Sequence, residues 1–409
     1  MKYFLFPFLF LSFFARAQTE SKIVLGTIDS VDSKILNEKR KVWVYVPNST
    51  GDDSYSKQHY PVVYLLDGDA HFYSVVGMIQ QLSSVNGNTV CPQMILVGIP
   101  NTDRTRDLTP THADSGFPYI DSNGTRNSGG GENFISFIEK ELMPHIDSAY
   151  PTAPYRMLIG HSFGGLTVMN TFFHHTKLFN AYVSIDPSMW WDNKKLLDEG
   201  KRLLVNNAYP GQILFLGIAN TMNAGMDTLQ VQSDTSAVTK HIRSILELNK
   251  YLGVNQQNKL RYHYRFYNDD DHGSVPLIAE YDALHFIFSY YKLKLSFDEY
   301  VNMNKSVIAK IEKHYEDVSA QLGYKVKLPE STANGFGYQA LGMKHYEEAE
   351  YLFKLNIANY PESANTYDSL GDLYEAKGDK ANAIGSFKKA LAIKESADTR
   401  KKMEKLQNK

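Results

Sequence analysis

Residues 158–165 read Leu158-Ile159-Gly160-His161-Ser162-Phe163-Gly164-Gly165, which contains the pentapeptide Gly-x-Ser-x-Gly. An apolar, strand-like run precedes the pentapeptide, and a helix-like run follows it. That setting is typical of a nucleophile elbow, a tight strand-to-helix turn that holds a serine exposed. Glycines flank the serine because such a turn has no room for a Cβ on either side. The pattern predicts that Ser162 is a catalytic nucleophile.

Short apolar runs recur on both sides of the elbow. They lie at 41–46, 61–66, 93–99, 155–160, 181–185, 212–218 and 260–267. Because they do not alternate strictly, they suit strands that are buried on both faces. Helix-like stretches lie between them, at 72–81, 132–146, 165–173 and 235–252. The alternation predicts an α/β fold, the α/β-hydrolase fold, with a mostly parallel sheet, helices on both faces and antiparallel edge strands over 21–46.

A serine hydroxyl is a poor nucleophile until a base takes its proton. The chain has 13 histidines that compete for this role. In an α/β hydrolase the base comes from a loop after the last core strand, downstream of the nucleophile and the acid. His272 has that position, in Asp269-Asp270-Asp271-His272-Gly273-Ser274. We therefore predict His272 as the base.

The acid of the triad is expected after the strand at 212–218. Asn220 stands there, and a long loop with Asp227 follows. Asp227 is the favoured acid, because it could orient the imidazole and stabilise the imidazolium. Asp186, at the end of the preceding strand, is the fallback. A Ser–His dyad steadied by Asn220 or by backbone carbonyls also stays open.

Two backbone N–H groups should stabilise the oxyanion of the tetrahedral intermediate. One is expected at Phe163, directly after the nucleophile, at the N-terminus of the elbow helix. The other is expected in the loop after Leu65-Leu66-Asp67-Gly68, which selects Asp69. An ordinary turn at Asp67-Gly68-Asp69 is the alternative interpretation.

Composition narrows the class of partner and the compartment. The formal net charge is −2 and the pI is about 6.7, so neither nucleic acid nor an anionic membrane is an expected partner. The single cysteine, Cys91, leaves no internal disulfide. Lys2, an apolar stretch over 4–14 and Ala15-Arg16-Ala17 predict a signal peptide over 1–17. We expect an exported protein, periplasmic or secreted, with no transmembrane segment in the mature chain.

After residue 291 the strand-like runs end and charged helical periodicity continues. A shift of 34 residues places Phe336, Gly337, Ala349 and Phe353 on Leu370, Gly371, Ala383 and Phe387. This spacing predicts two tetratricopeptide repeats. The predicted organisation is a signal peptide over 1–17, an α/β-hydrolase domain over 18–295, a helical linker over 296–330 and helical repeats over 331–409.

Several pieces of the chain resemble the putative-esterase family of α/β hydrolases, especially its enterobactin (enterochelin) esterase-like branch. They are 64–68, 97–99, 101–110, 129–134, the elbow, 186–191 and the His272 loop, within residues 21–292. The resemblance implies carboxyl-ester hydrolysis through an acyl-serine, without a metal or an organic cofactor. It assigns the nucleophile to Ser162, the base to His272 and the oxyanion donors to Phe163 and Asp69. The chain departs from the pattern of this family at two positions. Asn220 stands where relatives usually have an acidic residue, which concerns the acid, and Asp186 stands where they usually have a serine, which concerns the pocket.

Four further residues are candidates for substrate binding. Trp190 and Trp191 follow a strand end near the elbow, so they either wall an aromatic acyl or siderophore site or belong to the core. Arg104 and Arg106 either clamp a carboxylate or catecholate or pair with neighbouring aspartates in their own loop.

The sequence thus predicts an exported serine esterase that acts on a small-molecule ester, siderophore-type or another acyl ester. An acyltransferase is the rival within enzymes. The alternative class is a catalytically weak or inactive hydrolase scaffold that binds a protein partner through its repeat tail.

Overall fold

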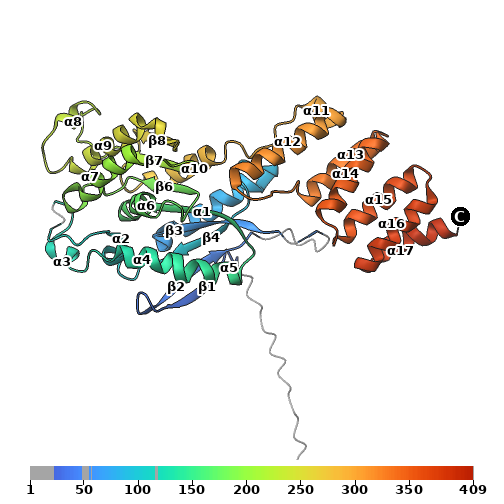
Figure 1. Cartoon of the computed structure of the whole chain (residues 1–409), viewed down its shortest axis with the longest axis horizontal. Coiled ribbons are helices and arrows are strands. Elements are labelled where there is room, and N and C mark those ends of the chain that lie inside the picture. Colours follow the sequence, from blue (N-terminus) through green and yellow to red (C-terminus); the bar gives the residue numbers. More distant parts are fainter. Residues whose placement is uncertain (1–22, 48–54, 57, 116–117, 409) are drawn as a thin grey trace, which may run out of the picture.

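The computed structural model describes residues 23–47, 55, 56, 58–115 and 118–408 of the 409-residue chain. The predicted signal peptide over 1–17 lies outside the described residues. Figure 1 shows a mixed sheet with its helices in one half of the molecule and a series of helices that extends to the C-terminus in the other half.

Within the described residues, eight strands form one sheet in the order β1-β2-β4-β3-β5-β6-β7-β8. The strands are β1 (Thr27–Ser33), β2 (Glu38–Tyr45), β3 (Tyr60–Leu66), β4 (Ile95–Ile99), β5 (Thr152–His161), β6 (Ala181–Ile185), β7 (Ile213–Ala219) and β8 (Arg261–Tyr267). β1 and β2 pair antiparallel, as do β2 and β4. The pairs from β4 to β8 are parallel. The expected mostly parallel sheet with an antiparallel edge is therefore present.

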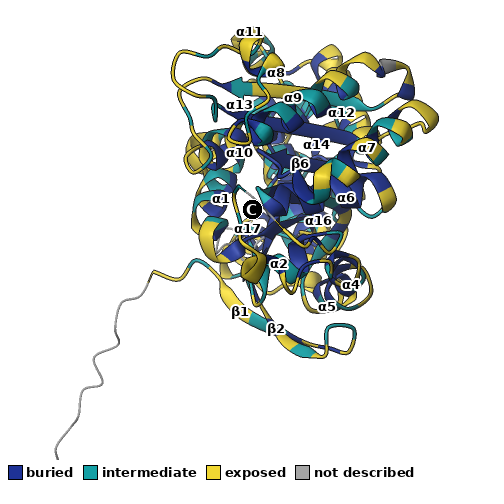
Figure 2. Cartoon of the chain, turned by 90° about the vertical axis from the view of Figure 1, so that its left-hand side faces the viewer, coloured by how far each residue is buried: buried dark blue, intermediate teal, exposed yellow. Residues whose placement is uncertain are grey.

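The central strands are apolar on both faces because helices cover both faces. Every residue of β3, β4, β6 and β7 is buried, whereas β1, at the sheet edge, keeps several exposed residues. Figure 2 shows the same contrast, with buried strands inside and exposed residues on the outer helices. Parallel strands of this kind direct their carboxyl ends to one edge of the sheet, where α/β folds place their sites.

Helices α1 and α10 share one apolar core with one face of the sheet, and α4, α6, α7 and α9 share another core with the opposite face. The helices of this part are α1 (Gly68–Ser83), η1 (Val85–Gly87), α2 (Arg104–Leu108), α3 (Ser122–Thr125), α4 (Gly131–Phe137), η2 (Ile138–Leu142), α5 (Met143–Ala149), α6 (Phe163–His174), α7 (Trp191–Asn206), α8 (Gln230–Ser233), α9 (Lys240–Val254), η3 (Gln256–Asn258) and α10 (Val275–Ile287). The helix expected at 132–146 is continuous but contains one π-helical turn, η2.

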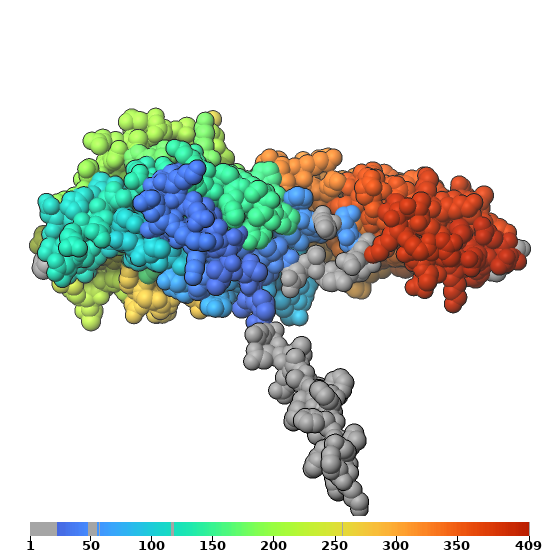
Figure 3. Space-filling view, turned by 90° about the horizontal axis from the view of Figure 1, so that it is seen from below, coloured from blue at the N-terminus to red at the C-terminus, as the bar shows by residue number. Residues whose placement is uncertain are grey.

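The C-terminal part is helical, and it forms the far end of the elongated molecule in Figure 3. Its helices are α11 (Phe297–Val301), α12 (Lys305–Leu322), α13 (Glu330–Gly342), α14 (Tyr346–Asn359), α15 (Ala364–Ala376), α16 (Lys380–Ile393) and α17 (Ala397–Gln407). Val318 and Leu322 of α12 belong to the core under α1 and α10, so this helix packs on the α/β part. Among the helices of the described ranges, none is long and apolar enough to cross a bilayer.

Two helix pairs of this tail have the same internal geometry. A Cβ added to Gly337 in α13 would lie 2.5 Å from Phe353 Cε1 in α14, and a Cβ added to Gly371 in α15 would lie 2.4 Å from Phe387 Cε1 in α16. In both pairs a glycine lets an aromatic ring from the next helix pack directly against the backbone. The two contacts repeat at the 34-residue spacing found in the sequence.

Candidate active site

The elbow forms between β5 and α6. Ser162 has φ 60° and ψ −113°, a strained conformation for a residue with a side chain. A Cβ on Gly160 would lie 2.4 Å from the Gly164 backbone, and one on Gly165 would lie 2.9 Å from Ile185 O. The turn is therefore tight enough to require glycine at these positions, and it leaves the Ser162 side chain partly accessible at the carboxyl end of β5.

His272 lies in the loop between β8 and α10, as expected. Its Nε2 is 3.1 Å from Ser162 Oγ, although 110 residues separate the two in the chain. The side chain of His272 is 41% exposed. Ser188 Oγ also lies near the Ser162 hydroxyl, at 3.5 Å. The structure thus brings together the predicted hydroxyl and the predicted imidazole at hydrogen-bonding distance.

The carboxylate beside His272 belongs to Asp186, and not to Asp227, which the sequence favoured as the acid. Asp186 Oδ2 lies 2.6 Å from His272 Nδ1. The Asp227 side chain is exposed and accepts hydrogen bonds from the backbone N–H groups of Leu229 and Gln230. Asp227 therefore organises its own loop. Asp186, the fallback candidate at the end of β6, thus lies where the sequence predicted a residue after β7.

Asn220, the other alternative, also makes local contacts. Its side-chain amide donates to Asn268 O at 3.0 Å, and its side-chain oxygen accepts from Met222 N at 3.3 Å. Its backbone N–H donates to Asp270 O, which ties the end of β7 to the loop that carries His272. Asn220 thus supports that loop through backbone and amide contacts.

Asp186 is fully buried and fully hydrogen-bonded. Ala219 N donates to Oδ1 at 3.0 Å, and His241 Nε2 lies 2.8 Å from Oδ2, the same oxygen that His272 contacts. Burial by itself raises the pKa of Asp186, but the charges and hydrogen bonds of His241 and His272 outweigh burial and hold this pKa well below its usual range. Asp186 is therefore an ionised carboxylate inside the protein.

His161, within the elbow, packs against His272 with its ring tilted by 42°. The ring centroids of His161 and His272 are 4.5 Å apart. Burial, followed by the nearby His272, lowers the pKa of His161 to about 3. A neutral His161 places no like charge beside the His272 ring.

Both expected oxyanion donors lie at helix N-termini. Phe163 is the first residue of α6 and Asp69 the second residue of α1, where backbone N–H groups have no acceptor within their own helix. The two helix starts are neighbours, because a Cβ on Gly164 would lie 3.1 Å from Asp67 Oδ2 and 3.4 Å from Leu66 Cβ. Helix N-termini favour negative charge.

Arg104 joins the two helix starts. Its guanidinium pairs with both carboxylate oxygens of Asp67, at 2.6 and 3.0 Å. It also donates to His161 O at 3.4 Å and lies 5.4 Å from the centre of the Phe163 ring. Asp67 already neutralises this arginine, yet the side chain stays 36% exposed. Arg104 therefore lies beside the elbow, and its charge is largely paired with that of Asp67 in the loop before α1.

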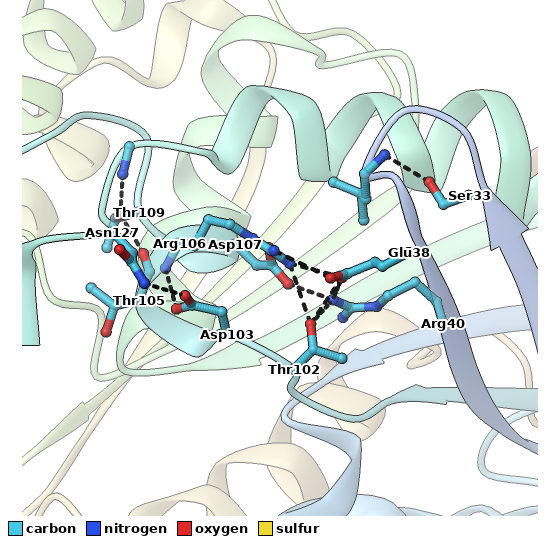
Figure 4. A network of polar contacts seen from close by, with 12 residues as sticks. Ser33, Glu38, Arg40, Thr102, Asp103, Thr105, Arg106, Asp107, Thr109 and Asn127 are labelled. Carbon is cyan, nitrogen blue, oxygen red and sulfur yellow. Dashed lines mark hydrogen bonds and ion pairs between the residues drawn. The ribbon is translucent and has the colours of Figure 1, made fainter.

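Arg106 contacts a different group of residues, which Figure 4 shows from close by. It pairs with Glu38 at 2.8 Å and with Asp107 at 2.7 Å. Asp107 also pairs with the buried Arg40 at 2.6 Å. This network ties α2 to β2. Arg106 therefore pairs with an aspartate of its own loop, which is the alternative to clamping a substrate, and its guanidinium points into this network.

The two tryptophans are mostly core residues. Trp190 and Trp191 are 5% and 2% exposed, and Trp191 Nε1 donates to Thr111 O at 3.0 Å. Both rings contact Phe163, with centroids 6.2 and 5.1 Å away. The accessible aromatic residue of this group is Tyr119, which is 40% exposed and lies 4.7 Å from the Trp190 ring.

Asp186, His241 and His272 offer three potential metal ligand atoms within 4.8 Å of one another. Ligands of tetrahedral zinc, at 2.0–2.1 Å from the metal, lie about 3.3 Å apart. Both imidazole nitrogens instead lie 2.6–2.8 Å from one carboxylate oxygen. The observed spacing is that of two hydrogen bonds to a shared acceptor.

Sequence reasoning missed His241, Tyr119 and Ser188. His241 is within the helix expected at 235–252, where a solvated face is the ordinary position for a histidine. Tyr119 and Ser188 are in loops, and only the three-dimensional structure shows that Tyr119 lies against Trp190 and that Ser188 lies near Ser162. The signal available for Asp186 was its position at a strand end next to the elbow strand.

Comparisons with known proteins agree with this architecture. The siderophore enterobactin esterase of Emericella nidulans is 27% identical over 256 residues, which is 57% of this chain and 83% of that protein. The ferri-bacillibactin esterase of Bacillus subtilis is 31% identical over 167 residues, 38% of this chain and 58% of that protein. An IroE-like serine hydrolase from Shewanella oneidensis has a TM-score of 0.67 at 28% identity and covers 81% of this chain and 98% of its own.

The proteins of Emericella nidulans and Bacillus subtilis are esterases by name, and they support an ester hydrolase here. The family described as "Putative esterase" matches residues 33–271, a region that holds β2 to β8, the elbow and Asp186. Since that match covers more than half of the chain, this protein belongs to the putative-esterase family.

Proposed function

We propose that this protein is an exported serine hydrolase that cleaves carboxyl esters through an acyl-serine intermediate. The observation that carries the proposal is the hydrogen-bonded series from Ser162 Oγ to His272 Nε2, at 3.1 Å, and from His272 Nδ1 to Asp186 Oδ2, at 2.6 Å. A nucleophile, a base and a carboxylate that orients the base form the arrangement that activates a serine.

In the first half of the reaction, His272 Nε2 takes the proton of the Ser162 hydroxyl while Oγ attacks the ester carbonyl. The negative charge that develops on the carbonyl oxygen is stabilised by the N–H groups of Phe163 and Asp69. His272, now an imidazolium, is stabilised by the buried Asp186 carboxylate. It then gives its proton to the leaving alkoxide, and an acyl-serine remains.

In the second half, water replaces the alcohol. His272 takes a proton from the water as its oxygen attacks the acyl carbon, and the same N–H groups stabilise the second tetrahedral intermediate. Collapse of the intermediate returns the proton to Ser162 Oγ and releases the carboxylic acid. The reaction needs the partly exposed position of His272, because both the alcohol and the water must reach its Nε2.

The substrate class proposed is a siderophore-type or other acyl ester. The names of the relatives support testing siderophore esters first. Tyr119, accessible beside Trp190, supports an aromatic acyl group as part of the substrate. Arg104 lies beside the elbow and is 36% exposed, but its pairing with Asp67 weakens it as an anion clamp.

Two further parts of the proposal concern the ends of the chain. Export is proposed from the signal-peptide pattern over 1–17. Tetratricopeptide repeats are proposed for α13 to α16, and the matching glycine–phenylalanine contacts of the two helix pairs support this assignment. A protein partner bound through these repeats belongs to the same proposal.

The test is a substrate panel with purified wild-type protein, Ser162→Ala and Ser148→Ala. Iron-free and iron-loaded siderophores stand beside short aryl esters, and added alcohols reveal acyl transfer. We expect Ser162→Ala to lose on the order of 10⁴-fold or more in kcat. Ser148, whose hydroxyl only contacts His145 O on the surface, should be neutral. Undiminished turnover by Ser162→Ala would overturn the mechanism, and a folded wild type without any turnover would favour the binding scaffold.

A further inference from the structure

One carboxylate oxygen accepts hydrogen bonds from two histidines. Asp186 Oδ2 lies 2.6 Å from Nδ1 of His272 and 2.8 Å from Nε2 of His241. The proposed mechanism uses only the first of these contacts. His241 comes from α9, an element that contributes nothing else to the proposed chemistry.

The buried position of Asp186 explains why a second donor is needed. Its side chain is 0% exposed, and a buried carboxylate costs several kcal/mol unless hydrogen bonds satisfy its oxygens. Oδ1 has Ala219 N. If His272 were the only donor to Oδ2, each displacement of His272 during the reaction would leave that oxygen unpaired inside the protein.

The two histidines differ in how firmly they are held. His272 is on a loop and its side chain is 41% exposed. The His241 side chain is 10% exposed and sits in the first turn of the 15-residue helix α9. Its backbone N–H donates to Tyr119 Oη at 3.1 Å, and its ring is perpendicular to that of His272 at 5.1 Å. His241 is the fixed donor of the pair, and His272 the accessible one.

We propose that His241 is a positioning residue: it donates Nε2–H to Asp186 Oδ2 and so holds the carboxylate in the orientation that aligns His272 with Ser162. The proposal rests on the proposed function of this site. A side chain of α9 thus holds the proposed acid in place, and this acid follows β6 instead of β7. His241 itself touches neither the substrate nor the reacting atoms.

The experiment compares two substitutions of His241 in the full chain. His241→Gln keeps an N–H donor at about the reach of Nε2, whereas His241→Leu keeps the bulk and removes the donor. We expect His241→Gln to stay within about threefold of the wild-type kcat. We expect His241→Leu to lose roughly 10- to 100-fold in kcat, because it loses a hydrogen bond to a charged group. KM should stay within about twofold in both variants.

A second readout reports on Asp186 without any turnover. The Nδ1–H proton of His272, identified in NMR spectra by its loss in His272→Gln, should keep its position in His241→Gln and move or exchange away in His241→Leu. If the leucine variant does not fold, His241→Asn replaces it, because its shorter amide does not reach Asp186.

Equal losses of kcat in the glutamine and leucine variants, or an unchanged kcat and proton resonance in His241→Leu, would overturn the proposal. A wild type that neither hydrolyses esters nor reacts at Ser162 would instead overturn the proposed function. In that case the His272 proton still decides whether His241 positions Asp186, so the two failures are distinguishable.

Discussion

Replacing Asp186 with asparagine tests the acid of the proposed triad. The change keeps the shape of the side chain and removes its charge. Because Asp186 is 0% exposed, no solvent is available to replace the lost charge beside His272. An asparagine amide nitrogen facing His272 would also favour the tautomer with the proton on Nε2, which cannot accept the proton of Ser162.

The expected effect is a fall in kcat of about 10³- to 10⁴-fold. The upper end is the loss caused by the same change in another serine-hydrolase triad, where geometry is kept and the tautomer is wrong. It corresponds to about 5 kcal/mol of transition-state stabilisation, at 1.36 kcal/mol for each factor of ten. A loss of this size is possible here because the carboxylate is ionised, buried and within 2.6 Å of His272.

The assay is steady-state hydrolysis of an aryl ester by Asp186→Asn and by the matched control Asp227→Asn, with circular dichroism to verify folding. Asp227 is exposed and contacts its own loop, so its variant should keep kcat within about twofold. A kcat of Asp186→Asn within tenfold of wild type, or an equal loss of activity in Asp227→Asn, would refute Asp186 as the acid.

Two predictions concern stability. Burial raises the pKa of Glu280 from 4.5 to about 8, so between these values the folded state keeps a proton that the unfolded chain has lost. The free energy of unfolding should therefore decrease by up to about 1.4 kcal/mol per pH unit as pH rises through this window. Glu280→Gln should remove this pH dependence when the free energy of unfolding is measured by urea titration at several pH values. The same pH dependence in both proteins would contradict the prediction. Gly371→Ala should destabilise the C-terminal helices by about 1–3 kcal/mol through its contact with Phe387, whereas Gly385→Ala, which meets nothing within 4 Å, should stabilise α16 by about 0.5–1 kcal/mol. Equal midpoints for these two variants would show that the glycine–phenylalanine contact does not matter.

The sequence predicted the sheet because its central strands are short apolar runs, buried on both faces, that stand between helices. It missed α7 and α10 for physical reasons. α10 exposes Leu277 and Tyr281, so its outer face carries no polar signal. α7 begins with residues at positive φ, including Asp192 and Asn193, so its first turn lacks regular helical geometry and a clear start in the sequence.

The candidate site was predictable where a residue follows from local geometry. Ser162 is defined by the elbow glycines, and His272 by its position after the last strand. The acid was not, because strand ends that are adjacent in a parallel sheet offer nearly equivalent positions. The Asp186 carboxylate is held by His241 and Ala219, which are 55 and 33 residues away in the chain. Contacts at such separations are not visible in the sequence.

The most direct test of the central claim is to map the site of covalent inactivation. Wild-type protein is incubated with a fluorophosphonate, digested and analysed by mass spectrometry. We expect a single adduct on Ser162, and a rate of labelling that falls more than about 100-fold in His272→Gln because the hydroxyl loses its base. An adduct on a different serine, such as the neighbouring Ser188, or an equal rate without His272, would contradict it.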